Sequence, residues 1–170
     1  MPNERLLDFL ELSGGETMVD YGADSGILTI LLARALRDGT VHAVDESTEM
    51  MRLLRERVES AALVNVETHL IRENRVPLGD GVADRVLAVN LLHEVVGETA
   101  LAEMRRLLLS PGGFLLVVDW RSDVEREMGP SASVTFPPGE AQELLEAAGF
   151  SVDPVPEIGF PYHLALVARP

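Results

Sequence analysis

The sequence predicts an α/β protein with a doubly wound, seven-stranded sheet that is mostly parallel and has one antiparallel strand near the C-terminus. Short apolar runs alternate along the chain with segments whose apolar residues recur at helical spacing. Such alternation implies right-handed crossovers and a parallel sheet covered on both faces. The connection between the last two apolar runs, about residues 156–162, is too short for a crossover helix, so the final strands should be antiparallel.

Each element follows from local signals in turn. Helices are predicted where apolar residues recur at helical spacing before a stop signal, at residues 4–12, 27–36, 48–62, 97–109 and 138–148. Ser47 is a suitable N-cap for the third helix, and Ser110 to Gly113 should end the fourth. Strands are predicted for apolar or alternating runs, at residues 18–19, 40–45, 64–71, 83–89, 114–119, 151–155 and 163–168.

The amino-acid composition excludes several kinds of functional site. We expect one domain over residues 1–170, since this length can bury a real core. The chain has no cysteine, which excludes disulfides and thiolate chemistry. All 14 basic residues are arginine, so a phosphate-binding or Schiff-base lysine is also excluded. The net charge of −14 argues against a nucleic-acid partner.

The chain shows no sign of export or of membrane insertion. Its first residues contain early acids and no long apolar core, unlike a secretory signal. The apolar runs, such as residues 114–118, are too short to span a bilayer. We therefore expect a cytoplasmic protein without a membrane partner. The four histidines have no spacing typical of zinc ligands, and no metal is predicted.

Polar side chains follow most of the predicted strands, where ligands bind in doubly wound sheets. They are Asp20 with the glycine turn after it, Asp45, Arg72 with Glu73, Asn90, and Asp119 with Trp120. The turn between Asp20 and the next helix should leave unpaired N–H groups and a helix N-terminus facing a ligand. The irregular, proline- and glycine-containing residues 121–136 are a candidate substrate-side loop, which we expect to be mobile.

The glycine spacing limits the kind of ligand. A dinucleotide site needs G-x-G-x-x-G, but Asp24 occupies the second glycine position and Ile27 the third. The acid that such sites place about 20 residues further on is present as Asp45, which could accept both ribose hydroxyls. These residues favour a nucleoside with a ribose and no obligatory pyrophosphate.

From about residue 4 to residue 169, the chain resembles the class I S-adenosylmethionine-dependent methyltransferases. Val19-Asp-Tyr-Gly-Ala-Asp-Ser-Gly26 is similar to the family's D-x-G-x-G-x-G motif, and Val44-Asp-Glu-Ser-Thr-Glu-Met50 to its second-strand motif. Later blocks follow in order: residues 77–86, Asn90-Leu-Leu-His-Glu94 and residues 109–120. The resemblance implies a Rossmann-like methyltransferase fold with S-adenosylmethionine as cofactor.

The resemblance also implies roles for single residues. Asp20 would face the methionine amino group, Asp45 the ribose hydroxyls, and Glu46 and Met50 the adenine. Asn90 and Leu91 would border the methyl group. The expected cofactor-binding set is Asp20, Gly22, Ala23, Asp24, Gly26, Asp45, Glu46, Met50, Glu73 and Asn90.

Two positions depart from the family pattern. Asp24 stands where the family commonly has glycine, which adds a negative charge near the ligand carboxylate. Arg72 stands where the family usually has an adenine-facing acid, and Glu73 follows one residue later.

No catalytic residue can be assigned from the sequence. His93 and Glu94 are acid/base candidates, but they also suit a partly buried imidazole and an acid that complements a helix dipole. Trp120 could wall an acceptor pocket or be half-buried under residues 121–136. Tyr162 is a further pocket candidate.

Three hypotheses remain open on the sequence. The first is a methyltransferase for a small acceptor; a chain with so little beyond its core fold favours a small acceptor, or a lid supplied by the second subunit of a homodimer. The second, motivated by Asp24 and Arg72, is a methyltransferase-like protein that binds the cofactor or a related nucleoside with weak catalysis. The third is a nucleotide-dependent reductase, which the glycine spacing disfavours.

Overall fold

The computed structural model describes residues 4–95, 98–108, 112–154 and 160–170. The helices are α1 (Glu4–Leu10), α2 (Ile27–Ala35), α3 (Thr48–Ser60), α4 (Glu98–Leu107) and α5 (Pro138–Ala147), with a 3₁₀ turn at Ala132–Val134. The strands are β1 (Thr17–Tyr21), β2 (Thr40–Asp45), β3 (Val66–Leu70), β4 (Arg85–Val89), β5 (Phe114–Trp120), β6 (Ser151–Pro154) and β7 (His163–Arg169). Every predicted helix and strand has a counterpart, so the predicted α/β class is confirmed.

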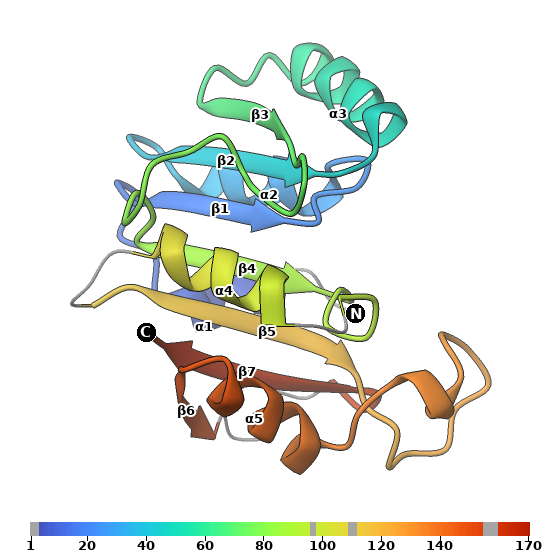
Figure 1. The fold of residues 1–170 in the computed structure, drawn as a ribbon. Coiled ribbons are helices and arrows are strands. Elements are labelled where there is room, and N and C mark those ends of the chain that lie inside the picture. Colours follow the sequence, from blue (N-terminus) through green and yellow to red (C-terminus); the bar gives the residue numbers. More distant parts are fainter. Residues whose placement is uncertain (1–3, 96–97, 109–111, 155–159) are drawn as a thin grey trace.

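The strands form one sheet in the order β3-β2-β1-β4-β5-β7-β6 (Figure 1). The pairs from β3 to β5 are parallel, whereas β7 runs antiparallel to both β5 and β6. This confirms the mostly parallel sheet with one antiparallel strand near the C-terminus. The order reverses between β1 and β4, and ligands of doubly wound sheets bind at such a switch point.

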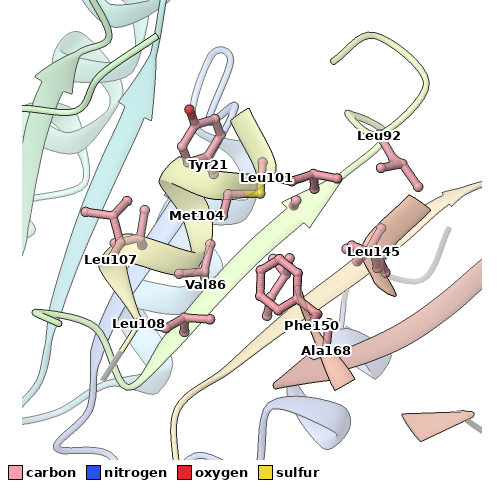
Figure 2. Packing of buried hydrophobic residues seen from close by; sticks show 14 of the residues in the cluster. Tyr21, Val86, Leu92, Leu101, Met104, Leu107, Leu108, Leu145, Phe150 and Ala168 are labelled. Atoms are coloured by element: carbon pink, nitrogen blue, oxygen red, sulfur yellow. The ribbon is translucent and has the colours of Figure 1, made fainter. Parts of the chain in front are cut away.

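Helices cover the two faces of the sheet unequally. Leucines of α1 and α2 pack with Val41 and Leu116 in one core cluster, and Met51 and Leu54 of α3 pack with Ala43 on the same face. On the other face, α4 and α5 cover the middle and the β7 side of the sheet, where their apolar side chains pack in the cluster shown in Figure 2. Over β1 and β2 that face meets the connection between β3 and β4 instead of a helix (Figure 1).

The third strand is shorter than the predicted range 64–71, since β3 begins at Val66 and ends at Leu70. Val64 is 99% exposed. The Asn65 amide donates to the carbonyl oxygens of Ala33 and Leu36 at 2.9 and 2.8 Å. The Asn65 side chain therefore binds the end of α2, while its carbonyl oxygen accepts from the Val41 amide of β2 at 2.9 Å. Alternation of residue types alone does not reveal the side-chain role. Other boundaries differ from the predictions by a few residues, as frayed ends normally do.

Some predicted features fall outside the described residues. They are residues 97 and 109–111 at the ends of the fourth predicted helix, Val155, and most of the 156–162 connection. Within the part of the chain that the structure describes, no helix is long and apolar enough to cross a membrane.

Candidate functional site

A cleft lies at the carboxyl ends of β1, β2 and β4, beside the switch point. It consists of two adjoining hollows of roughly 640 and 380 Å³. Both are lined by Gly22, Asp45, Glu46, Leu91 and Glu94, so they form one continuous site. The larger hollow also contacts the start of α2, and the smaller one reaches α4 through Thr99 and Ala100.

The glycine turn after β1 uses its own N–H groups, contrary to the expectation that they face a ligand. Gly22 and Ala23 donate to the Val44 carbonyl oxygen at 2.9 and 3.0 Å, and Gly26 donates to that of Ala23 at 2.9 Å. The Asp24 and Ser25 amides donate to the carboxylates of Asp45 and Asp24. A ligand therefore meets the first turn of α2, whose N-cap Gly26 has no side-chain cap, rather than free amides in the turn.

Two glycines in this turn are required by packing. Gly22 and Gly26 have φ values of 77° and 87°, where other residues are strained. A Cβ atom at Gly22 would lie 3.0 Å from Leu91 Cδ1, and one at Gly26 would lie 2.8 Å from Leu54 Cγ. Gly22 therefore lets Leu91 close over the turn, and Gly26 lets α3 approach α2.

Asp24 takes the left-handed conformation that a glycine would adopt more easily. Its φ is 48°, a region that aspartate tolerates better than most residues. Its amide donates to Asp45 Oδ2 at 2.9 Å, and its side chain is exposed and lines the larger hollow. The backbone geometry of the glycine position is thus preserved, and the added feature is the charge.

Asp45 ends β2 and is held from two sides. Its Oδ2 accepts from the Asp24 amide, and its Oδ1 accepts from the Ser47 amide at 2.8 Å. Ser47 in turn caps α3 by accepting from the Met50 amide at 3.3 Å, as the sequence predicts. Each carboxylate oxygen retains a lone pair. Asp45 can therefore present a preoriented pair of acceptors to two neighbouring hydroxyl groups.

Asp20 is a buried carboxyl group at the base of the larger hollow. It is 2% exposed and accepts a hydrogen bond from Thr29 Oγ1 at 2.6 Å. Burial, together with the negative charge of Asp45, raises the pKa of Asp20 to about 6, although the Thr29 hydrogen bond opposes the shift. A cationic group beside Asp20 would favour its ionised form.

The larger hollow is strongly acidic. None of the described residues that line it is an arginine, although Arg57 donates to Ser25 of its lining at 3.2 Å. Five carboxylates line it: Asp20, Asp24, Asp45, Glu46 and Glu94. Such a surface attracts a cationic ligand and repels phosphates. Met50 and Asn90 also line this hollow, so it gathers most of the expected cofactor set.

Glu73 lies apart from the expected cofactor-binding residues that line the larger hollow. Arg72 and Arg75 exchange backbone hydrogen bonds around a tight turn, in which Glu73 and Asn74 have positive φ. Asn74 lines the smaller hollow, whereas Glu73 is exposed and borders neither hollow. Asn74 is not among the residues predicted for the site, and neither are the other residues of the smaller hollow: Tyr21, Ile71, Val95, Thr99 and Ala100. Their sequence pattern is that of ordinary core and surface positions.

His93 is held by a buried acid. Its ring Nδ1 lies 2.7 Å from Asp119 Oδ1, and its amide donates to Asp119 Oδ2 at 3.0 Å. Its Nε2 lies 3.8 Å from Oε1 of Glu94, which lines both hollows, whereas His93 itself lines neither. With Nδ1 donating to the carboxylate, Nε2 is left as a proton acceptor. Asp119 therefore fixes both the loop after β4 and the orientation of the imidazole.

Trp120 and Tyr162 lie elsewhere. The Trp120 ring lies beside the His163 ring, with centroids 4.2 Å apart and planes tilted by 36°, and it contacts Gly129 of the segment that follows β5. Tyr162 is partly exposed just before β7. Neither borders the two hollows described above.

The buried Asp20 carboxyl should lower the stability of the protein at neutral pH. Its folded pKa of about 6 lies above the ordinary value of 3.8, so stability is lost as pH rises through this interval and stays reduced above it. Asp20→Asn should therefore raise the unfolding free energy above pH 6 by about 1–3 kcal/mol and change it little near pH 3.5. Denaturant unfolding across pH 3.5–8 measures this. A stability gain that does not vary with pH would contradict the assignment.

Comparisons with known proteins agree with this geometry. The methyltransferase domain family matches residues 18–113. A crystal structure of an S-adenosylmethionine-dependent methyltransferase from Aquifex aeolicus is 30% identical, with a TM-score of 0.90 over 98% of this chain and 88% of that chain. An uncharacterised methyltransferase of Mycobacterium tuberculosis is 34% identical over 88% of this chain and 53% of its own length. Trans-aconitate 2-methyltransferase of Pseudomonas paraeruginosa is 34% identical over 71% of this chain and 42% of its own length.

The curated relatives are longer, since the chain spans between about a third and a half of their length. The family match covers both the glycine turn and Asp45, and the solved relative extends over nearly the whole fold. The chain therefore belongs to the S-adenosylmethionine-dependent methyltransferases, and S-adenosylmethionine is the cofactor of this family.

Proposed function

We propose that the protein transfers the methyl group of S-adenosylmethionine to a small acceptor bound beside the loop after β4. The observation that carries the proposal is the acidic larger hollow, which the preoriented carboxylate of Asp45 lines. S-adenosylmethionine brings a sulfonium and an ammonium group to this surface, and its ribose offers two adjacent hydroxyls to Asp45. A dinucleotide would bring phosphates instead, which the same carboxylates repel.

Each part of the cofactor has a proposed partner. The ribose hydroxyls donate to Asp45, and the ammonium group lies at Asp20, whose ionised form it stabilises. Glu46 and Met50 border the adenine, and the adenine amine lies toward the turn that contains Glu73 and Asn74. The methyl group then points to Asn90 and Leu91 at the end of β4.

The reaction is an in-line displacement. A lone pair of the acceptor forms the new bond to the methyl carbon while the C–S bond breaks, and its electrons pass to sulfur to give neutral S-adenosylhomocysteine. The cleft contributes alignment and exclusion of water, because the sulfonium is already activated. Since the acidic hollow loses a cationic partner when sulfur becomes neutral, product release is favoured over cofactor release.

An acceptor that must lose a proton has a candidate base. His93 is held with Nδ1 toward Asp119, which leaves Nε2 to take the proton of a hydroxyl group or an activated carbon. We propose this role for His93 with such acceptors. The acids around the smaller hollow disfavour a polyanionic acceptor, so an uncharged or cationic small molecule fits it better.

The cofactor assignment is tested by binding. Isothermal titration of the full chain should show one S-adenosylmethionine site, and Asp45→Ala should weaken it by about 1–3 kcal/mol because the ribose hydroxyls lose their acceptors. Asp38→Ala, which removes an exposed acid after α2, is the matched control and should bind normally. Equal affinities in the two variants would remove the ribose assignment. Absence of binding at millimolar cofactor would overturn the proposed function.

The charge of Asp24 should weaken cofactor binding through the methionine carboxylate. Asp24→Asn and Asp24→Gly should both tighten S-adenosylmethionine binding, by roughly 1 kcal/mol, the size expected for two like charges about 4 Å apart in water. Both substitutes tolerate the positive φ of this position. 5′-Methylthioadenosine lacks the carboxylate, so its affinity should stay unchanged. Tighter binding of both ligands would instead point to an altered turn.

The role of His93 is tested with acceptors of different acidity. His93→Gln should lower kcat for a hydroxyl acceptor by roughly 10²–10⁴ while leaving cofactor affinity within about twofold. A carboxylate acceptor is already ionised and should be methylated at an unchanged rate. Equal rates for both acceptors in wild type and variant would exclude His93 as the base. Cofactor binding without transfer to any acceptor of a broad panel would favour the binding-protein alternative.

A further inference from the structure

Three potential metal ligands gather on the edge of the sheet, away from the cleft. His42 lies in β2, and Glu67 and His69 lie in β3, the edge strand. His42 pairs with Glu67 in the parallel register, and His69 follows two residues later, so all three point to the same face. Neither hollow of the cleft is lined by any of the three.

The distances between the ligand atoms match a metal site. His42 Nδ1 lies 3.1 Å from His69 Nε2. Glu67 Oε2 lies 3.5 Å from His42 Nδ1 and 3.7 Å from His69 Nε2. In a tetrahedral zinc site with bonds of about 2.0–2.1 Å, neighbouring ligand atoms are about 3.3–3.4 Å apart. The three atoms therefore approximate one face of a zinc tetrahedron without rearrangement of the strands.

We propose that His42, Glu67 and His69 bind a divalent transition-metal ion such as Zn²⁺, with the fourth position left to water. Two imidazoles and one carboxylate are a donor set that zinc accepts, and three protein ligands plus water is a known arrangement.

The surroundings suit this role. The two imidazoles are mostly covered, with side chains 12% and 17% exposed, whereas Glu67 is 61% exposed and leaves a path for the ion. Burial lowers the pKa of both His42 and His69, which favours the neutral rings that bind metals. In the metal-free protein one ring N–H can donate to the other ring. When the ion binds, the donating ring changes tautomer, so that its proton moves to its other ring nitrogen and both rings stay neutral.

Metal binding at this site would affect the stability of the sheet rather than methyl transfer. β3 is the outermost strand on its side of the described sheet, and an ion held jointly by β2 and β3 would secure it. His42 also lies three residues before Asp45 on β2, or roughly 10 Å along the strand. The site therefore stands independently of the proposed methyltransferase activity.

The test is metal binding by the full chain after treatment with a chelator. Zn²⁺ titration should show one ion per chain, and His42→Gln and His69→Gln should each weaken binding by roughly tenfold or more. Glu67→Gln should weaken it as well. Glu59→Gln, which neutralises an exposed acid on α3, is the matched control and should bind as wild type. Co²⁺ in the wild-type site should show the visible absorption of four-coordinate cobalt.

A second measurement needs no variant. Zn²⁺ should shift the imidazole NMR signals of two of the four histidines and leave the other two in place. Binding that persists unchanged in His69→Gln, or several weak ions per chain, would show binding to surface carboxylates and overturn the proposal. Unshifted imidazole signals in the presence of excess Zn²⁺ would overturn it too.

Discussion

The organisation of the cleft depends on the end of β2. The Val44 carbonyl accepts from two amides of the glycine turn, and the Asp45 carboxylate accepts from the Asp24 amide and from the amide of Ser47. These bonds join three elements: the turn after β1, the last residue of β2 and the start of α3. The turn can hold its positive φ values because every one of its amides is paired. The same carboxylate that supports the turn is thereby oriented toward the ligand.

The cleft is negatively charged, because carboxylates line it and no arginine is among its described lining residues. The ionised form of Asp20 is disfavoured there, since burial and the nearby Asp45 raise its pKa to about 6. A buried acid without a cationic partner lowers the stability of the fold at neutral pH, and a bound cationic group would offset this loss. The buried Asp20 carboxyl thus lowers the stability of the fold at a position where a charge suits a cationic ligand, and such a trade-off between stability and function is common at functional sites.

β2 links two sites of different chemistry. Its carboxyl end carries Asp45 in the cleft, and its middle carries His42 beside the edge strand. The face on which His42 lies is covered by α4 and α5 only further along the sheet, so polar side chains can gather over β2 and β3. On the opposite face, apolar residues such as Val41 and Ala43 pack against the helices.

The sequence alone determined the element order, the mostly parallel sheet and the position of Asp45, because apolar periodicity and strand ends are local properties. It did not reveal the pairing of the turn amides with Val44 and Asp45, the His93–Asp119 contact, or the meeting of His42 with Glu67 and His69. It also did not distinguish Glu73 from Asn74, since a tight turn decides which side chain meets the cleft. These contacts depend on register between strands distant in sequence and on turn geometry, which only the tertiary structure decides.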